Sequence, residues 1–204
     1  IVGCLPLLLL RTIPRMRNHA AVTMPAKMMP IILAGGAGVR LSPLSTPQKP
    51  KPFLSLYSPR PLLAETYARV DEPQIFLPPV VIGQADHQPL FKRCAEEWGL
   101  SFESIILEPS GKNTAPAFAA AALYARQYHG EDCVLVILPC DHVIAPLPAF
   151  HETLQIAHVA AAQGAIATLG IKPERAETGL GYILAGDYSD TSVARIESFI
   201  EKPD

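Results

Sequence analysis

A glycine-rich loop at residues 33–41, LAGGAGVRL, has the composition of an anion-binding loop. Its glycines let the backbone come close to a ligand and point N–H groups at it. These glycines are Gly35, Gly36 and Gly38. Arg40 adds a planar cation, and Lys51 stands between two prolines that stiffen the chain around it. Together these groups suit a triphosphate, whereas a tight turn without a ligand is the alternative for the glycines alone.

The order of residues in this loop excludes two common nucleotide motifs. A P-loop ends in Gly-Lys-Ser/Thr, but Gly38 is followed by Val39 and Arg40. A dinucleotide loop, GxGxxG, would need glycine at position 41, which is Leu41. The loop also continues into prolines instead of a helix.

Asp141 follows the most apolar run of the chain, Val134–Leu138. A carboxylate at the end of a buried strand can hold Mg²⁺, which prefers one or two carboxylates together with phosphate oxygens. A cap of the following turn is the alternative for Asp141. We interpret the adjacent His142 as a structural residue that hydrogen-bonds the loop.

Strands and helices must alternate to position these groups. The apolar runs Ile31–Leu33, Val80–Ile82, Ile105–Leu107 and Val134–Leu138 predict buried strands. Helices are predicted over 62–70, 89–98, 149–163 and the alanine-rich segment that begins at Thr114. Short strands in hairpins are predicted after residue 170, where glycines recur. This alternation predicts an α/β fold, a Rossmann-like, mostly parallel sheet flanked by helices, with ligands beyond the carboxyl ends of its strands.

Composition restricts the class of protein. Of 204 residues, 49% are hydrophobic, so a substantial core is expected, and a net charge of -2 without a basic stripe argues against nucleic-acid binding. The four cysteines form no CxxC pair, which favours free thiols in a cytoplasmic protein. The run LPLLLL near the start is too short to span a membrane. We expect residues 1–27 to be a disordered extension outside the fold, with a secretory signal as the alternative, and residues 28–204 to form the domain.

The segment at residues 33–54, LAGGAGVRLSPLSTPQKPKPFL, resembles the signature of the sugar-phosphate nucleotidyltransferases, a GGxGxRL loop followed by PLS and PK-x-F-L. The spacing between Ser45 and Pro50 resembles the mannose-1-phosphate guanylyltransferase branch, which includes forms fused to an isomerase. The resemblance implies a nucleotide-diphospho-sugar transferase type of fold, in which Arg40 and Lys51 contact the triphosphate. Ser42, where this branch usually has Trp, and Pro52, where it often has Gln, depart from the pattern.

Two further segments resemble the nucleotide side of this family. The segment at 108–116, EPSGKNTAP, could by itself be a helix N-cap at Asn113 or Thr114. It is similar to the family's base-pocket segment, which implies that Glu108, Lys112 and Asn113 face guanine. LPCDHV at 138–143 resembles a motif whose aspartate binds metal, and this implies Mg²⁺ on Asp141.

Two segments near the end resemble the sugar side. ETGLGYI at 177–183 could be an ordinary hairpin turn, but it resembles the border of the sugar pocket. FIEKP at 199–203 resembles a motif whose lysine meets the sugar phosphate. The residues implied for substrate binding are Gly179, Gly181, Tyr182, Glu201 and Lys202.

The resemblance implies transfer of a guanylyl group from GTP to mannose 1-phosphate, which gives GDP-mannose and pyrophosphate with Mg²⁺. A UTP- or dTTP-using relative, a non-catalytic relative and an incomplete, inactive product stay open. The chain stops at Asp204, four residues after a strand pattern at Val193–Ile200, so we expect a domain truncated at its C-terminus. A homo-oligomer, and a missing C-terminal region or fused isomerase domain, stay open as partners.

Overall fold

The computed structural model describes residues 7–12, 26–36, 38, 41–188 and 193–203. The chain divides into two compact units. The parallel-sheet unit is Ala26–His142, and the hairpin unit comprises Ile1–Pro25 and Val143–Asp204. No helix among the described residues is long and apolar enough to cross a membrane.

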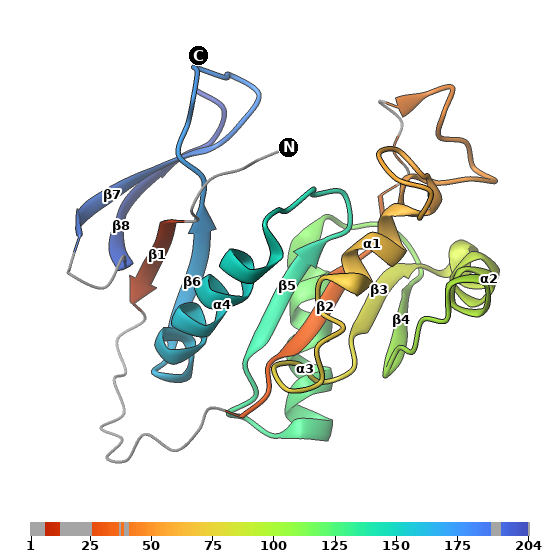
Figure 1. Ribbon diagram of the computed structural model, residues 1–204, viewed down its shortest axis with the longest axis horizontal. Coiled ribbons are helices and arrows are strands. Elements are labelled where there is room, and N and C mark those ends of the chain that lie inside the picture. The colour runs from red at the N-terminus through yellow and green to blue at the C-terminus, as the bar shows by residue number, and fades with distance from the viewer. Residues whose placement is uncertain (1–6, 13–25, 37, 39–40, 189–192, 204) are drawn as a thin grey trace. The chain divides into compact units, whose positions relative to one another are not determined.

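The parallel-sheet unit contains the four strands that the apolar runs predict. Their order is β4 (Ser104–Glu108), β3 (Val80–Gln84), β2 (Met29–Leu33) and β5 (Leu135–Pro139), and every neighbouring pair is parallel (Figure 1). This confirms the predicted parallel sheet. In the register, Leu33 lies opposite Pro139, and Gln84 lies opposite Glu108. The carboxyl ends of all four strands therefore meet at one edge, which we call the carboxyl edge.

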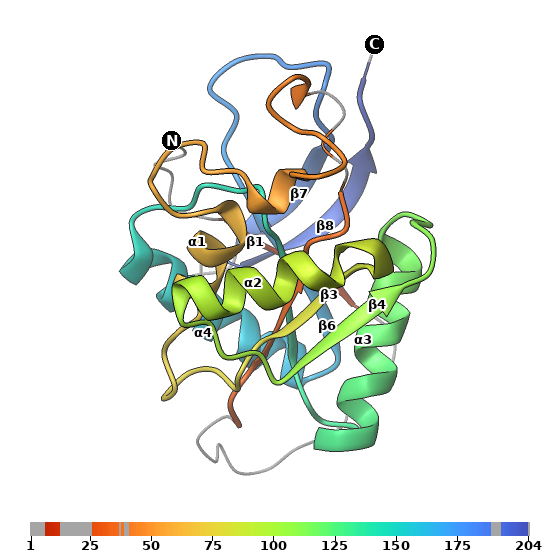
Figure 2. The same cartoon turned by 90° about the vertical axis from the view of Figure 1, so that its right-hand side faces the viewer.

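Helices cover both faces of this sheet because neighbouring strand residues point to opposite sides. On one face, Ile31 and Val80 pack against α3 (Thr114–His129), whose buried alanines recur every fourth residue, at Ala117, Ala121 and Ala125. On the other face, Ile32 and Val81 pack against α1 (Leu62–Ala68) and α2 (Gln88–Trp98) through Leu63 and Phe91. Figure 2 shows α2 and α3 on either side of β3 and β4. The result is the α/β sandwich that the sequence predicts.

The hairpin unit has a mixed sheet in the order β6 (Ala165–Gly170), β1 (Leu7–Thr12), β8 (Val193–Ile200) and β7 (Tyr182–Tyr188). Strands β7 and β8 form an antiparallel pair, as expected from the glycine-punctuated sequence. Helix α4 (Leu147–Ala162) lies beside β6. The described cysteines, Cys94, Cys133 and Cys140, form no disulfide.

Strand β1 corrects one expectation. Residues 1–27 were expected to lie outside the fold, but Leu7–Thr12 pairs antiparallel with β6 and parallel with β8. The physical reason is hydrogen bonding. Without β1, the facing edges of β6 and β8 would leave backbone N–H and C=O groups unpaired, and a strand between them pairs with both. Residues 1–6 and 13–25 lie outside the described part of the chain.

Candidate functional site

The carboxyl edge brings together three of the segments that the sequence singles out. The backbone N–H of Cys140, beside Asp141, donates over 3.2 Å to the carbonyl of Leu33, the first residue of the glycine loop. A Cβ placed on Gly35 would lie 3.2 Å from Glu108 Oε2. The glycine loop and the segments 108–116 and 138–143 therefore converge, as expected for ligand-binding loops at the carboxyl ends of parallel strands.

Lys51 and Asp141 form an ion pair at this edge. Lys51 begins the short 3-10 helix η2 (Lys51–Phe53), and its Nζ lies 2.5 Å from Asp141 Oδ2. The side chains are 28% and 37% exposed, so a ligand can reach both. Burial raises the pKa of the Asp141 carboxyl, but the hydrogen bond and charge of Lys51 outweigh burial and hold the pKa below its ordinary value. The carboxylate is therefore ionised at neutral pH, as a hard cation requires.

Gly38 allows this lysine to lie against the glycine loop. Its φ is +70°, and a Cβ placed on it would lie only 2.6 Å from Lys51 Cβ. Ser45 Oγ donates to the Gly38 carbonyl over 2.5 Å, and it would lie 3.2 Å from the same Cβ. Gly36 faces open space, with no atom within 4 Å of a Cβ placed there. Arg40, the second predicted cation, lies outside the described residues.

Asn113, in the segment 108–116, has a strained backbone. It stands at the N-cap position of α3 with φ 63° and ψ -164°, a region that essentially only glycine occupies. Its side chain makes no capping hydrogen bond, so helix capping does not explain the asparagine. Glu108 ends β4 beside Gly35, and Lys112 is exposed.

Gln84 joins this segment, although sequence reasoning missed it. It ends β3, and its Nε2 lies 3.3 Å from a Cβ placed on Gly111. The available signal was a polar side chain directly after the apolar run VVIG, at the end where parallel strands present ligands.

The hairpin unit brings the two sugar-side motifs together. Tyr182 pairs with Ile200 across β7 and β8. A Cβ placed on Gly181 would lie 3.0 Å from Glu201 Oε2. Lys202 Nζ lies 3.3 Å from Glu201 Oε1, and both side chains are more than half exposed. One end of the hairpin therefore presents a cation, a carboxylate and bare backbone.

The turn that precedes β7 is held by Glu177. The Tyr182 hydroxyl accepts from the backbone N–H of Glu177 over 2.7 Å, and Glu177 Oε1 accepts from the N–H of Gly179 at 3.4 Å. Lys202, like Asn113, has a positive φ, here 42°, and these two are the only non-glycine residues in the described ranges with that property. Backbone strain of this kind tends to cluster at functional sites.

The residues present can bind Mg²⁺ only if phosphate oxygens supply the other ligands. In the described part of the chain, no group of three or more His, Cys, Asp or Glu side chains could hold a metal ion. Asp141 offers one accessible carboxylate, and Mg²⁺ commonly takes one or two carboxylates and completes its shell with phosphate oxygens and water. Asp141 therefore fits a cation that arrives with a nucleotide.

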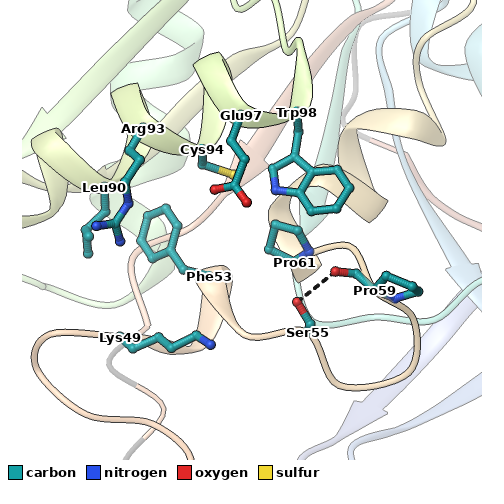
Figure 3. Close-up of a pocket in the computed structure, with 10 residues that line it drawn as sticks. All are labelled: Lys49, Phe53, Ser55, Pro59, Pro61, Leu90, Arg93, Cys94, Glu97 and Trp98. Carbon is teal, nitrogen blue, oxygen red and sulfur yellow. Dashed lines mark hydrogen bonds between the residues drawn. The ribbon is translucent and has the colours of Figure 1, made fainter.

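A separate cavity of about 270 Å³ lies between α2 and the segment 49–61. Figure 3 shows Arg93 on one side of the Phe53 ring, Pro61 and Trp98 on the other side, and Lys49 below it. None of the predicted site residues lines this cavity. The candidate site is instead the carboxyl edge, where the charged groups and bare backbone that phosphates need are found.

Residues 29–204 match the family described as nucleotidyl transferase. The chain belongs to the nucleotidyl transferase family. This agrees with the resemblance of the loop and aspartate motifs, and with the parallel sheet whose carboxyl edge carries them.

The chain is also similar to individual proteins of known name. The chain is 43% identical over 177 residues to xanthan biosynthesis protein XanB of Xanthomonas campestris, covering 87% of this chain and 37% of the relative. It is 39% identical over 181 residues to a mannose-1-phosphate guanylyltransferase of Escherichia coli, with 87% and 38% covered. The chain thus spans less than two fifths of the length of these relatives.

A crystal structure described as mannose-1-phosphate geranyltransferase from Thermus thermophilus superposes with a TM-score of 0.70 at 30% identity. The match covers 88% of this chain and 51% of that one. A structure described as mannose-6-phosphate isomerase from Helicobacter pylori has a TM-score of 0.66 at 25% identity, covering 87% and 61%. Both structures share the fold of most of this chain.

Proposed function

We propose that this chain binds GTP at the carboxyl edge and takes part in guanylyl transfer to mannose 1-phosphate. The observation that carries this proposal is the Lys51–Asp141 pair beside the glycine loop, at 2.5 Å. The relatives described as mannose-1-phosphate guanylyltransferases support guanine as the base and mannose 1-phosphate as the acceptor. Glu108, Lys112 and Asn113 are the residues proposed to face the base.

The chemistry requires charge neutralisation more than proton transfer. An oxygen of the sugar phosphate attacks the α-phosphorus of GTP, and the bond to the β-phosphate breaks, which releases pyrophosphate. A phosphate monoester has its second pKa near about 6, so the attacking oxygen is already anionic at neutral pH. Two polyanions must nevertheless meet in line, and fixed cations lower the repulsion between them. Lys51 supplies one such charge, and Arg40 is the second proposed.

Asp141 would hold Mg²⁺ together with phosphate oxygens of the nucleotide. When bound, the ion supplies positive charge that stabilises the departing pyrophosphate. Because Lys51 already contacts Asp141, the lysine amine lies where that phosphate chain must come. If Mg²⁺ bound Asp141 in place of Lys51, the Lys51 ammonium would be free to contact the phosphates.

The sugar side is assigned to the hairpin unit. Lys202 is proposed to bind the phosphate of mannose 1-phosphate, since its ammonium is exposed at the end of β8. Glu201, Tyr182, Gly179 and Gly181 are proposed to border the sugar, where carboxylate oxygens and backbone groups can accept and donate hydrogen bonds to hydroxyls.

Thermal unfolding with GTP, UTP and dTTP at equal concentrations and with Mg²⁺ tests this function. A ligand that binds only the native state raises the melting temperature according to its affinity. We expect GTP to give the largest increase. Equal increases for the three nucleotides would remove the guanine assignment, and no increase with any of them would contradict the nucleotide site itself.

A further inference from the structure

The backbone on both sides of Asp141 is held by two side chains of helix α1 and its C-cap. Thr66 Oγ1 donates to the carbonyl of Cys140 over 3.2 Å, and Arg69 Nη2 donates to the carbonyl of His142 over 2.6 Å. Asp141 stands between these two carbonyls. Its carboxylate can therefore move only as far as these two anchored peptide groups allow.

The two side chains are also coupled to each other. Arg69 Nη2 donates to Thr66 Oγ1 over 2.9 Å, and Thr66 Oγ1 donates to the carbonyl of Leu62 over 2.9 Å. A guanidinium never accepts, so the hydroxyl of Thr66 must accept from Arg69 and share its single proton between Leu62 and Cys140. The Thr66 hydroxyl therefore links Arg69, the Leu62 carbonyl and the Cys140 carbonyl in one network.

Burial makes these bonds difficult to replace. Thr66 is 0% exposed and Arg69 is 6% exposed, so water does not readily take over either role. Buried hydrogen bonds to a charged donor are among the stronger ones in proteins, and removing one partner leaves a desolvated polar group behind. The hydrogen bonds to the carbonyls of Cys140 and His142 thus hold the backbone around Asp141 rigidly.

Arg69 also reaches the segment that follows Lys51. Burial raises the pKa of the Tyr57 hydroxyl, four residues after η2, and the nearby Arg69 guanidinium opposes that rise. The same guanidinium therefore contacts the loop that carries Asp141 and the segment downstream of Lys51. Arg69 thus lies near both segments that supply the ion pair.

We infer that Thr66 and Arg69 are positioning residues. They hold the Asp141 carboxylate next to Lys51, where it can bind the Mg²⁺ that accompanies the nucleotide. This inference rests on the proposed function, since it assigns the two residues to the same site. Neither residue contacts the ligand in this role; both act through the backbone of Cys140 and His142.

The test compares Thr66→Val, which keeps the shape and removes the hydroxyl, with Thr66→Ser, which keeps the hydroxyl. Thr153→Val is the matched control, because Thr153 is also buried on a helix and donates to the carbonyl four residues earlier, that of Ala149, over 2.8 Å. In the full chain, two quantities are measured. One is amide hydrogen exchange at residues 140–142, and the other is the ratio of the Kd for GTP without and with Mg²⁺.

We expect Thr66→Val to speed exchange at residues 140–142 and to reduce the Mg²⁺-dependent gain in GTP affinity about fivefold to tenfold, as for the loss of one buried hydrogen bond. Thr66→Ser should restore most of the gain, and Thr153→Val should change neither quantity. Arg69→Lys, which keeps the charge but not the fork, should also reduce the gain. This second variant decides the question if Thr66→Val does not fold.

Two outcomes separate this inference from the proposed function. If the wild type gains GTP affinity with Mg²⁺ and both Thr66→Val and Arg69→Lys keep the full gain, the positioning role is wrong while the function stands. If the wild type itself gains nothing with Mg²⁺, the proposed metal–nucleotide site is wrong, and the positioning role is overturned with it.

Discussion

Asp141 differs from asparagine in charge but hardly in size, so Asp141→Asn separates a metal ligand from a turn residue. The variant loses an ion pair that is partly exposed, and such pairs contribute little, so the free energy of unfolding should change by less than about 1 kcal/mol. Mg²⁺ should no longer strengthen GTP binding, because the hard cation loses its carboxylate. Isothermal titration with and without Mg²⁺ measures this. An undiminished Mg²⁺ effect in Asp141→Asn would make Asp141 a turn residue.

Asn113 occupies a backbone conformation that suits glycine, yet glycine is absent there. Asn113→Gly should relieve strain and leave the free energy of unfolding equal to the wild type or higher by up to about 1 kcal/mol, while GTP binding weakens. Asn113→Ala is the control, since it keeps the strain and removes the amide. Denaturant unfolding and GTP titration measure the two effects. Wild-type GTP affinity in Asn113→Gly would separate the strain from nucleotide binding.

The junction between the glycine loop and η2 depends on Gly38. Gly38→Ala combines a positive φ with a Cβ that would lie 2.6 Å from Lys51 Cβ, so we expect a loss of about 2 kcal/mol or more in stability. Gly99→Ala shares the positive φ, at +65°, but meets no atom within 4 Å, and should lose only about 1 kcal/mol. Gly36→Ala should be nearly neutral. Urea unfolding of the three variants measures these differences.

The comparison among these glycines isolates the contact with Lys51. If Gly38→Ala is no less stable than Gly99→Ala, then the loop and η2 move apart without cost. The close packing between the two elements would then contribute nothing to stability.

The two units should respond to different substrates. GTP with Mg²⁺ should slow hydrogen exchange in the parallel-sheet unit, at residues 34–38, 108–114 and 140–142. Mannose 1-phosphate should slow it in the hairpin unit, at residues 177–182 and 200–203. Peptide-resolved exchange mass spectrometry measures both patterns. Protection by mannose 1-phosphate at 108–114 alone would contradict the assignment of the sugar side to β7 and β8.

Local sequence alone determined much of the chain. The apolar runs predicted β2, β3, β4 and β5 because a strand buried on both faces must be apolar throughout. The sequence predicted a helix over 89–98, and α2 has Pro89 in its first turn, where the fixed φ of proline suits a helix start. The loop, aspartate and hairpin motifs were likewise readable, because each is a short contiguous segment. Their placement at strand ends followed from the topology rule for parallel sheets.

Only the tertiary structure decided which distant groups meet. Lys51 and Asp141 are 90 positions apart, and Glu108 lies beside Gly35 because β4, β3 and β2 are successive neighbours in the sheet. In the sequence, Thr66 and Arg69 look like ordinary helix residues. Their side chains nevertheless donate hydrogen bonds to the carbonyls of Cys140 and His142, on either side of Asp141. The apolar run near the N-terminus was expected to lie in an extension outside the fold. Part of it instead forms β1, which pairs with β6 and β8. Strand order and backbone pairing are long-range properties, and no local pattern of residues encodes them.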